Sequence, residues 1–120
     1  MKKKIIICFD LDNTLCRTIN NNYEKSKPIK KNINLLNKLY DKGFYIKIFT
    51  SRYMGRNNEN KSKAKKMALK ITKKQLKNWN INYNKLILGK PSYDVIIDDK
   101  SLNYKKNWTK DLKKLFLWKN

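Results

Sequence analysis

The residues of this chain best suited to chemistry are two aspartates, Asp10 and Asp12, which follow an apolar run directly. The run from Ile5 to Phe9 is short and rich in β-branched side chains, as is typical of a buried strand in a parallel sheet. Two carboxylates held this close together repel each other unless a cation or a shared proton lies between them. The segment therefore predicts a divalent-metal site at the end of a strand.

Further polar residues follow the later apolar runs in the same way. They are Thr50, Ser51 and Arg52 after residues 44–49, Lys90 after residues 86–88, and Asp98 and Asp99 after residues 95–97. Because the carboxyl ends of parallel strands meet at one edge of a sheet, where open α/β sheets bind ligands, we expect these side chains to join the first two aspartates in one pocket.

Each of these groups has a role in transferring a phosphoryl group. Asp10 is predicted to attack phosphorus as a carboxylate nucleophile. Asp12 is predicted to protonate the leaving oxygen and later to deprotonate water. Thr50 and the backbone amides that follow it are expected to bind phosphate oxygens, and Lys90 is expected to neutralise the charge that builds on them.

The remaining pair, Asp98 and Asp99, adds anionic oxygen to the predicted metal site. Oxygen ligands in octahedral geometry are those that Mg²⁺ prefers, so we expect Mg²⁺ as the cofactor. The chain contains no histidine, which excludes Ser-His-Asp and Cys-His catalysis and His-ligated zinc. Acid–base chemistry must therefore fall to carboxylates or lysine.

The segments between the apolar runs predict the elements that position the pocket. Pro28 is expected to open a helix that Gly43 ends, and residues 61–70 are expected to form a second helix. Thr72 and Gln75 fit a capping box, which predicts that a further helical turn starts there. A short helix is expected over residues 110–116, with four strands over residues 5–9, 44–49, 86–88 and 95–97.

The order of these elements predicts a mostly parallel sheet with right-handed crossovers. We therefore expect an α/β fold, a Rossmann-like three-layer sandwich. A length of 120 residues is typical of a single domain, which we assign to residues 1–120.

The net charge of +21 suggests anionic partners, nucleic acid among them. Almost all of the excess is lysine spread along the chain, which is typical of composition drift in an AT-rich genome. We interpret the charge in this way and keep nucleic acid as the alternative. The three arginines, Arg17, Arg52 and Arg56, are expected to flank the pocket, where they either bind a second anionic group of the substrate or remain solvated.

The other classes that the composition bears on are membrane, secreted and zinc proteins. No segment approaches the roughly 20 apolar residues of a membrane span, and the first apolar run stops too early for a signal peptide. We therefore expect a cytoplasmic protein without a membrane partner. Cys8 and Cys16 lack the spacing of a zinc site or a disulfide framework and are predicted to be packed thiols.

Taken in order, these motifs resemble those of phosphatases of the haloacid dehalogenase (HAD) superfamily. The first motif, DxDxT, is matched by Asp10, Asp12 and Thr14, the second by Thr50, the third by Lys90, and the fourth by Asp98 and Asp99. The resemblance implies a phosphatase with an aspartyl-phosphate intermediate. It also implies Mg²⁺ held by the Asp10 carboxylate, the Asp12 backbone carbonyl and Asp98. Asp99 would either bind the ion directly or contact one of its ligands.

The intervals between the motifs are filled by the crossovers, so the resemblance is to capless members of that superfamily. Residues 49–56 and 89–91 are similar to small phosphatases of capsule and surface-polysaccharide gene clusters. This implies a small phosphorylated substrate, namely a sugar phosphate or a related precursor, and allows a homo-oligomer that lends a lid. The alternatives are a nucleotide or polynucleotide-end phosphatase, and a basic nucleic-acid-binding module without activity.

Overall fold

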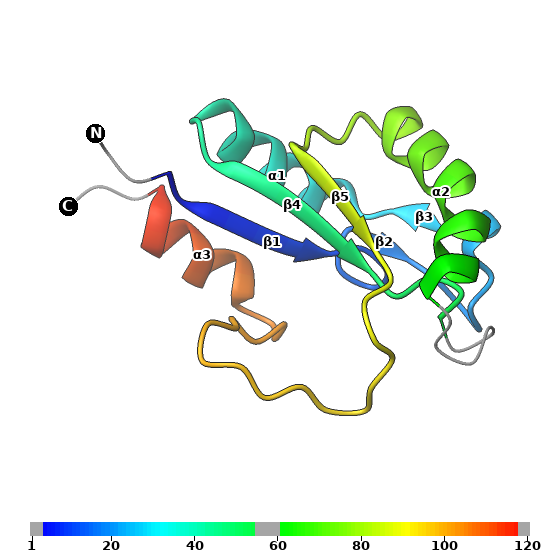
Figure 1. Ribbon diagram of the computed structural model, residues 1–120. Helices are drawn as coiled ribbons and strands as arrows, with labels where there is room; N and C mark the ends of the chain where they lie inside the picture. Colours follow the sequence, from blue (N-terminus) through cyan, green and yellow to red (C-terminus); the bar gives the residue numbers. More distant parts are fainter. Residues whose placement is uncertain (1–3, 55–60, 118–120) are drawn as a thin grey trace.

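Three parallel strands form the centre of the protein in a computed structural model that describes residues 4–54 and 61–117. The strands are β1 (Ile6–Asp10), β4 (Tyr45–Thr50) and β5 (Lys85–Leu88), and their order across the sheet is β1-β4-β5 (Figure 1). Both pairings are parallel, with Asp10 opposite Phe49 and Phe49 opposite Ile87. The three strands therefore end at one edge of the sheet, as predicted.

In the part of the chain that the structure describes, three α-helices complete the α/β fold: α1 (Lys30–Asp41), α2 (Lys61–Asn78) and α3 (Trp108–Phe116). Each contributes to one apolar core, in which Leu36, Leu76 and Leu112 meet strand residues such as Ile48. The predicted class, a Rossmann-like sandwich with a mostly parallel sheet and no cap domain, is confirmed. Within the described ranges, no helix combines the length and the apolar character that crossing a bilayer would require.

A small antiparallel hairpin lies between β1 and α1. It consists of β2 (Cys16–Arg17) and β3 (Lys27–Pro28), with the 3-10 helix η1 (Tyr23–Lys25) between them. Pro28 therefore ends a strand rather than opening a helix, and α1 begins at Lys30. The backbone amide of Ile29 donates to the carbonyl of Leu15 at 2.9 Å, which ties the hairpin to the turn that carries Asp12.

The second helix runs without a break through Thr72, so the predicted restart at a capping box is wrong. Thr72 and Gln75 lie three positions apart on one helix and therefore share a face. Both side chains accept hydrogen bonds from the guanidinium of Arg52 instead of capping the backbone.

The predicted fourth strand over residues 95–97 is also wrong, because no strand of residues 4–54 and 61–117 lies beside this segment. Val95, Ile96 and Ile97 are exposed, with 96% of Ile97 accessible to solvent. The preference of β-branched residues for strands largely reflects packing against neighbours, which are missing here. Asp98 accepts a hydrogen bond from the backbone amide of Lys100 at 2.8 Å, a local turn that competes with strand formation.

Replacing Ile97 with Asn tests the conformation of this segment. Because the side chain is almost fully exposed, Ile97→Asn should change the free energy of unfolding by no more than about 0.5 kcal/mol. The matched change Ile48→Asn, at a fully buried position, should cost several times more. Urea denaturation measures both. A loss of about 2 kcal/mol or more for Ile97→Asn would contradict the exposed arrangement.

Candidate active site

Asp10 and Lys90 form an ion pair at the carboxyl edge of the sheet. Asp10 ends β1, while Lys90 follows β5 on the far side of β4. The Lys90 side chain reaches across the ring of Phe49, with Nζ 5.9 Å from the ring centroid, and Nζ lies 3.4 Å from Oδ1 of Asp10. The strand order thus brings together two residues that are eighty positions apart in sequence. The predicted convergence of Asp10 and Lys90 is confirmed.

Burial and the ion pair affect the protonation of both groups. Burial raises the pKa of Asp10 above its ordinary value, while the charge of Lys90 opposes that rise. Burial alone would lower the pKa of Lys90, but hydrogen bonding to Tyr93 and the charge of Asp10 outweigh it, so this pKa is raised. Lys90 therefore remains a cation beside a carboxyl group that is 40% exposed.

Asp12 is positioned by a tight turn around the carbonyl oxygen of Leu11. That oxygen accepts backbone hydrogen bonds from Thr14, Leu15 and Cys16 at 2.8–3.3 Å, and the buried Leu11 side chain anchors the turn in the core. Asn13 has a φ of 62°, a left-handed conformation that asparagine tolerates.

Arg52 does not line the pocket, although the sequence predicted that it would bind substrate. Only 1% of the residue is exposed, and its guanidinium is paired with the Asp12 carboxylate. Nε donates to both carboxylate oxygens at 3.2 and 3.0 Å, and Nη2 donates to Oδ1 at 3.0 Å. Arg52 therefore fixes the Asp12 carboxylate from the buried side, behind the pocket.

The other side of the guanidinium connects α2 to the hairpin. Nη1 donates to Thr72 and Gln75 of α2, and the Gln75 amide donates to the carbonyl of Tyr23 at 2.7 Å. The Tyr23 ring lies 5.2 Å from the guanidinium carbon, and Ser26 accepts a longer bond of 3.5 Å. The network thus joins three separate parts of the chain around the Asp12 carboxylate.

Thr50 and Ser51 occupy different places in the site. Thr50 is fully buried, and its hydroxyl accepts a hydrogen bond from the backbone amide of Arg52 at 3.2 Å. The predicted role of Thr50 as a phosphate ligand is therefore not supported, because its hydroxyl supports the loop below the pocket. Ser51 lines the pocket, as predicted. Arg56 lies outside the described residues.

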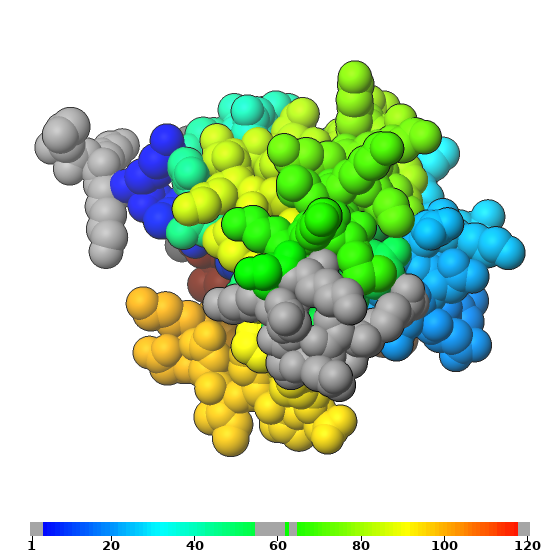
Figure 2. Space-filling model, turned by 45° about the vertical axis from the view of Figure 1, so that its right-hand side comes forward, coloured from blue at the N-terminus to red at the C-terminus, as the bar shows by residue number. Residues whose placement is uncertain are grey.

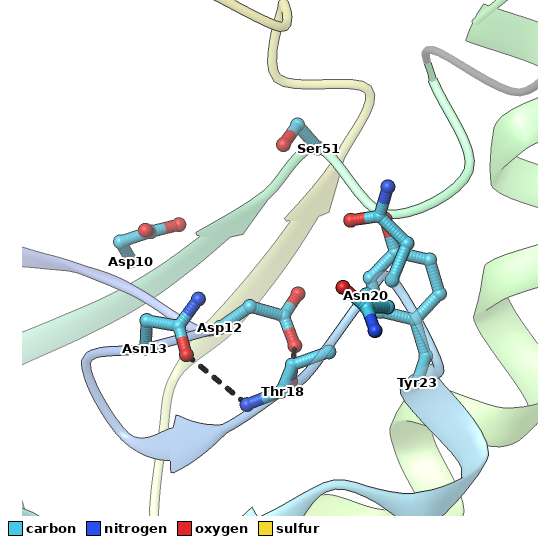
Figure 3. A pocket seen from close by; sticks show the side chains of 8 residues that line it. Asp10, Asp12, Asn13, Thr18, Asn20, Tyr23 and Ser51 are labelled. Carbon is cyan, nitrogen blue, oxygen red and sulfur yellow. Dashed lines mark hydrogen bonds between the residues drawn. The ribbon is translucent and has the colours of Figure 1, made fainter.

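The pocket has a volume of about 330 Å³, and both aspartates are among the side chains that line it (Figure 3). It is lined by Asp10, Asp12, Asn13, Thr18, Asn20, Asn21, Tyr23 and Ser51. Thr18 donates to Oδ1 of Asp12 at 2.6 Å, and its backbone amide donates to the side chain of Asn13 at 3.1 Å. The sequence analysis missed four of these lining residues, Thr18, Asn20, Asn21 and Tyr23, which only their position just after the DxDxT motif could have indicated.

Asp98 and Asp99 do not join the first two aspartates. They lie on the exposed segment between β5 and α3, and nowhere in residues 4–54 and 61–117 do three His, Cys, Asp or Glu side chains gather closely enough to hold a metal ion. The Asp12 carboxylate is occupied by Arg52 and Thr18. The arrangement therefore supplies the Asp10 half of the expected Mg²⁺ site but does not form a complete one.

The two cysteines differ in exposure, while burial raises the pKa of both thiols. Cys16 is fully buried beside Arg52. Burial, together with the negative charge of the neighbouring Asp12, raises the pKa of its thiol to about 11. Cys8 is exposed, contrary to the prediction of a buried thiol. Since the thiolate is the reactive form, we expect a disulfide reagent at pH 8 to modify Cys8 in the folded protein and Cys16 only after unfolding.

The control for this prediction is Cys8→Ser. It should show no fast-reacting thiol in the native state and one thiol in urea. Modification of both thiols at the same rate in the native wild type would contradict the buried position of Cys16.

Comparisons with known proteins support the fold. No family model matches the chain, and no curated protein matches it significantly. A crystal structure of a structural-genomics target from Vibrio cholerae is similar, with a TM-score of 0.81 and 25% identity over 93% of this chain and 96% of that one.

Two structures of the Pnkp1/Rnl/Hen1 complex, one of them described as an RNA repair complex, are similar over 95% of this chain. Their TM-scores are 0.50 and 0.53 at 18% and 20% identity. The match covers only 32% and 34% of those longer chains, so this chain spans about a third of their length. At this identity the likeness shows the fold alone.

Proposed function

We propose that this protein is a phosphomonoester hydrolase that works through an aspartyl-phosphate intermediate, as its resemblance to HAD phosphatases implies. The observation that carries the proposal is the position of the Asp10 carboxylate. It lines a polar pocket and lies 3.4 Å from the Lys90 ammonium. A carboxylate with a fixed cation beside it suits attack on an anionic phosphate, because the cation offsets the repulsion between the two anions.

In the proposed first step, a carboxylate oxygen of Asp10 forms a bond to phosphorus while the bond from phosphorus to the leaving oxygen breaks. The leaving oxygen takes a proton and departs as an alcohol. In the second step, water attacks the phosphorus of the acyl phosphate, loses a proton and releases inorganic phosphate, which restores Asp10. Lys90 offsets the charge on the transferred group in both steps.

We assign the proton transfers to Asp12. Its Oδ1 receives hydrogen bonds from Arg52 and Thr18, whereas Oδ2 receives one, from Nε of Arg52 at 3.0 Å. A carboxylate oxygen has two lone pairs, so Oδ2 is the atom with capacity to exchange a proton. Ser51, which lines the same pocket, is the hydroxyl proposed to contact the phosphate.

We retain Mg²⁺ as part of the proposal, with Asp10, Asp12, Asp98 and Asp99 as the residues that would hold it. When bound, it would stabilise negative charge on the phosphate oxygens. Because Asp98 and Asp99 are exposed, the proposal requires residues 94–99 to move toward Asp10.

Calorimetric titration of Mg²⁺ tests the metal separately from activity. Asp98→Asn should weaken binding at least about tenfold, whereas Asp94→Asn, a matched change in the same segment, should leave it unchanged. Absence of Mg²⁺ binding by the wild type would remove the metal from the proposal.

A sugar phosphate or a related surface-polysaccharide precursor is the proposed substrate, and the cytoplasm is the proposed location. The second candidate is a nucleotide or polynucleotide-end phosphatase. It is favoured by the net charge of +21.

Measuring phosphate release from sugar phosphates, nucleotides and 3′- or 5′-phosphorylated oligonucleotides, with and without Mg²⁺, tests the proposed activity and distinguishes the two substrates. We expect turnover of at least one monoester class. No turnover of any of them, combined with DNA binding that weakens as salt rises, would instead support the basic nucleic-acid-binding module.

Lys90→Met should lower kcat by about 10²- to 10³-fold, because it removes the fixed cation beside the reacting groups. Lys100→Met is the matched control, since Lys100 lies on the exposed segment before α3. This variant should retain full activity. Steady-state kinetics on any accepted substrate measure the effect. Full activity in Lys90→Met would contradict the role assigned to this lysine.

A further inference from the structure

A second pocket, of about 350 Å³, lies beside the candidate active site on the hairpin. It is lined by Arg17, Ile19, Asn20, Asn22, Lys25 and Lys27, and we call it the hairpin pocket. Asn20 lines this pocket and the pocket above Asp10, so the two are neighbours with a shared wall. In Figure 2 the blue atoms that follow β1 in sequence form the right-hand projection of the molecule, open to solvent.

The hairpin pocket has three cationic side chains and no acidic one in its lining. Arg17 and Lys27 stand directly opposite each other in the β2–β3 pair. Like charges at directly opposed positions of an antiparallel pair destabilise it. Neither residue, nor Lys25, forms an ion pair with any residue in the described ranges. Glu24, the one acidic residue of the hairpin, does not line the pocket.

An anion is the ligand that this arrangement fits, because it would offset the repulsion between Arg17 and Lys27. The wall is not purely charged, since Ile19 is 68% exposed within it and the lysine stems add apolar surface. A phosphate attached to an organic group satisfies both properties. Arg52 and Arg17, which the sequence did not distinguish, therefore have separate roles. Arg52 is buried beside Asp12, whereas Arg17 is exposed and accessible to a ligand.

We propose that the hairpin pocket binds a second phosphate of the substrate while the first is placed at Asp10. This inference rests on the proposed phosphatase function and narrows its substrate class to compounds that carry two phosphates. The second phosphate belongs either to a small bisphosphate or to the next residue of an oligonucleotide strand, which present the same chemistry to the pocket.

The test compares kcat/KM for matched pairs of substrates with one and two phosphates. The pairs are glucose 6-phosphate with glucose 1,6-bisphosphate, adenosine 3′-monophosphate with adenosine 3′,5′-bisphosphate, and the same monophosphate with a 3′-phosphorylated dinucleotide. In the wild type we expect a preference of about tenfold or more for the member with two phosphates, the size of one charge-assisted contact. The pair with the largest preference identifies the source.

The double variant Arg17→Gln/Lys27→Gln should reduce that preference to near parity and leave the rate with the monophosphates unchanged. Lys38→Gln/Lys85→Gln removes the same charge from α1 and from the amino end of β5, away from both pockets, and should retain the preference. Turnover of monophosphates and bisphosphates with equal efficiency in the wild type would overturn this inference while leaving the proposed function standing.

Binding of adenosine 3′,5′-bisphosphate, measured by calorimetry with Asp10→Asn added to each protein, keeps the test independent of turnover. We expect the hairpin double variant to bind about tenfold more weakly than the wild type and the control double variant to bind equally well. Equal binding by all three proteins would overturn the hairpin pocket as a phosphate site. Absence of phosphate release from every substrate, with this difference in binding intact, would overturn the proposed function alone.

Discussion

Replacing Asp10 with Asn is expected to abolish phosphate release, with a loss on the order of 10⁴-fold or more, as for other catalytic nucleophiles. The amide lacks the anionic oxygen that forms the bond to phosphorus, and Lys90 loses its partner. The fold should be retained, because the Asp10 side chain is 40% exposed and its ion pair contributes at most about 1 kcal/mol at such a position. Single-turnover kinetics and urea denaturation measure the two effects.

Asp41→Asn is the matched control for this variant. Asp41 is an exposed residue at the end of α1, so the same chemical change there should alter neither activity nor stability. Undiminished turnover in Asp10→Asn would contradict the assignment of the nucleophile. Loss of turnover accompanied by unfolding would contradict the view that Asp10 contributes little to stability.

Replacing Arg52 with Met is expected to have the largest effect on stability, about 3 kcal/mol. Removing the guanidinium leaves the mostly buried Asp12 carboxylate without its cation and leaves the Thr72 and Gln75 oxygens without their donor. Truncating one partner of a buried ion pair is costly for this reason. Activity should fall as well, because Asp12 loses the group that holds it.

Two further variants separate charge from geometry at this position. Arg52→Lys keeps the charge but cannot make the paired contacts of the guanidinium, so we expect a stability between wild type and Arg52→Met. Arg17→Met removes an exposed arginine and should cost no more than about 0.5 kcal/mol. Urea denaturation measures the free energy of unfolding of all three variants. The comparison requires that this free energy depends equally steeply on urea concentration in each of them. Equal stabilities for Arg52→Met and Arg17→Met would contradict the buried network.

The strands of the sheet and the pairing of Asp10 with Lys90 were predictable from the sequence. Each of the three strands is an apolar run that ends at a polar or turn-forming residue, so its carboxyl end is visible in the sequence. Once the sheet is taken as parallel, those ends must share an edge. The meeting of Asp10 and Lys90 follows from strand order and needs no knowledge of the loops.

The place of Arg52 was not predictable in the same way. An arginine after a strand is exposed in most proteins, and its burial here depends on partners from α2 and from the hairpin. The pattern of Thr72 and Gln75 is the same whether they cap a helix or accept bonds from a guanidinium. Only the tertiary arrangement distinguishes these roles.

The predictions for the hairpin and for residues 95–97 were wrong for opposite reasons. The hairpin strands are two residues long, too short to show the alternation that indicates a strand. The Val-Ile-Ile run shows strong strand preference, but strand preference is realised only where a neighbouring strand exists. As a result, the pocket residues of the hairpin were missed, and Asp98 and Asp99 were assigned to an edge that they do not reach.

Trapping the covalent intermediate tests the central claim most directly. The wild-type enzyme would be mixed with an accepted phosphomonoester, quenched in acid during the first turnover and treated with borohydride, which reduces an acyl phosphate to an alcohol. Peptide mass spectrometry should then find homoserine at residue 10, and only in samples that received substrate. Phosphate release at full rate with an unmodified Asp10, or with the modification at another carboxylate, would contradict the proposed mechanism.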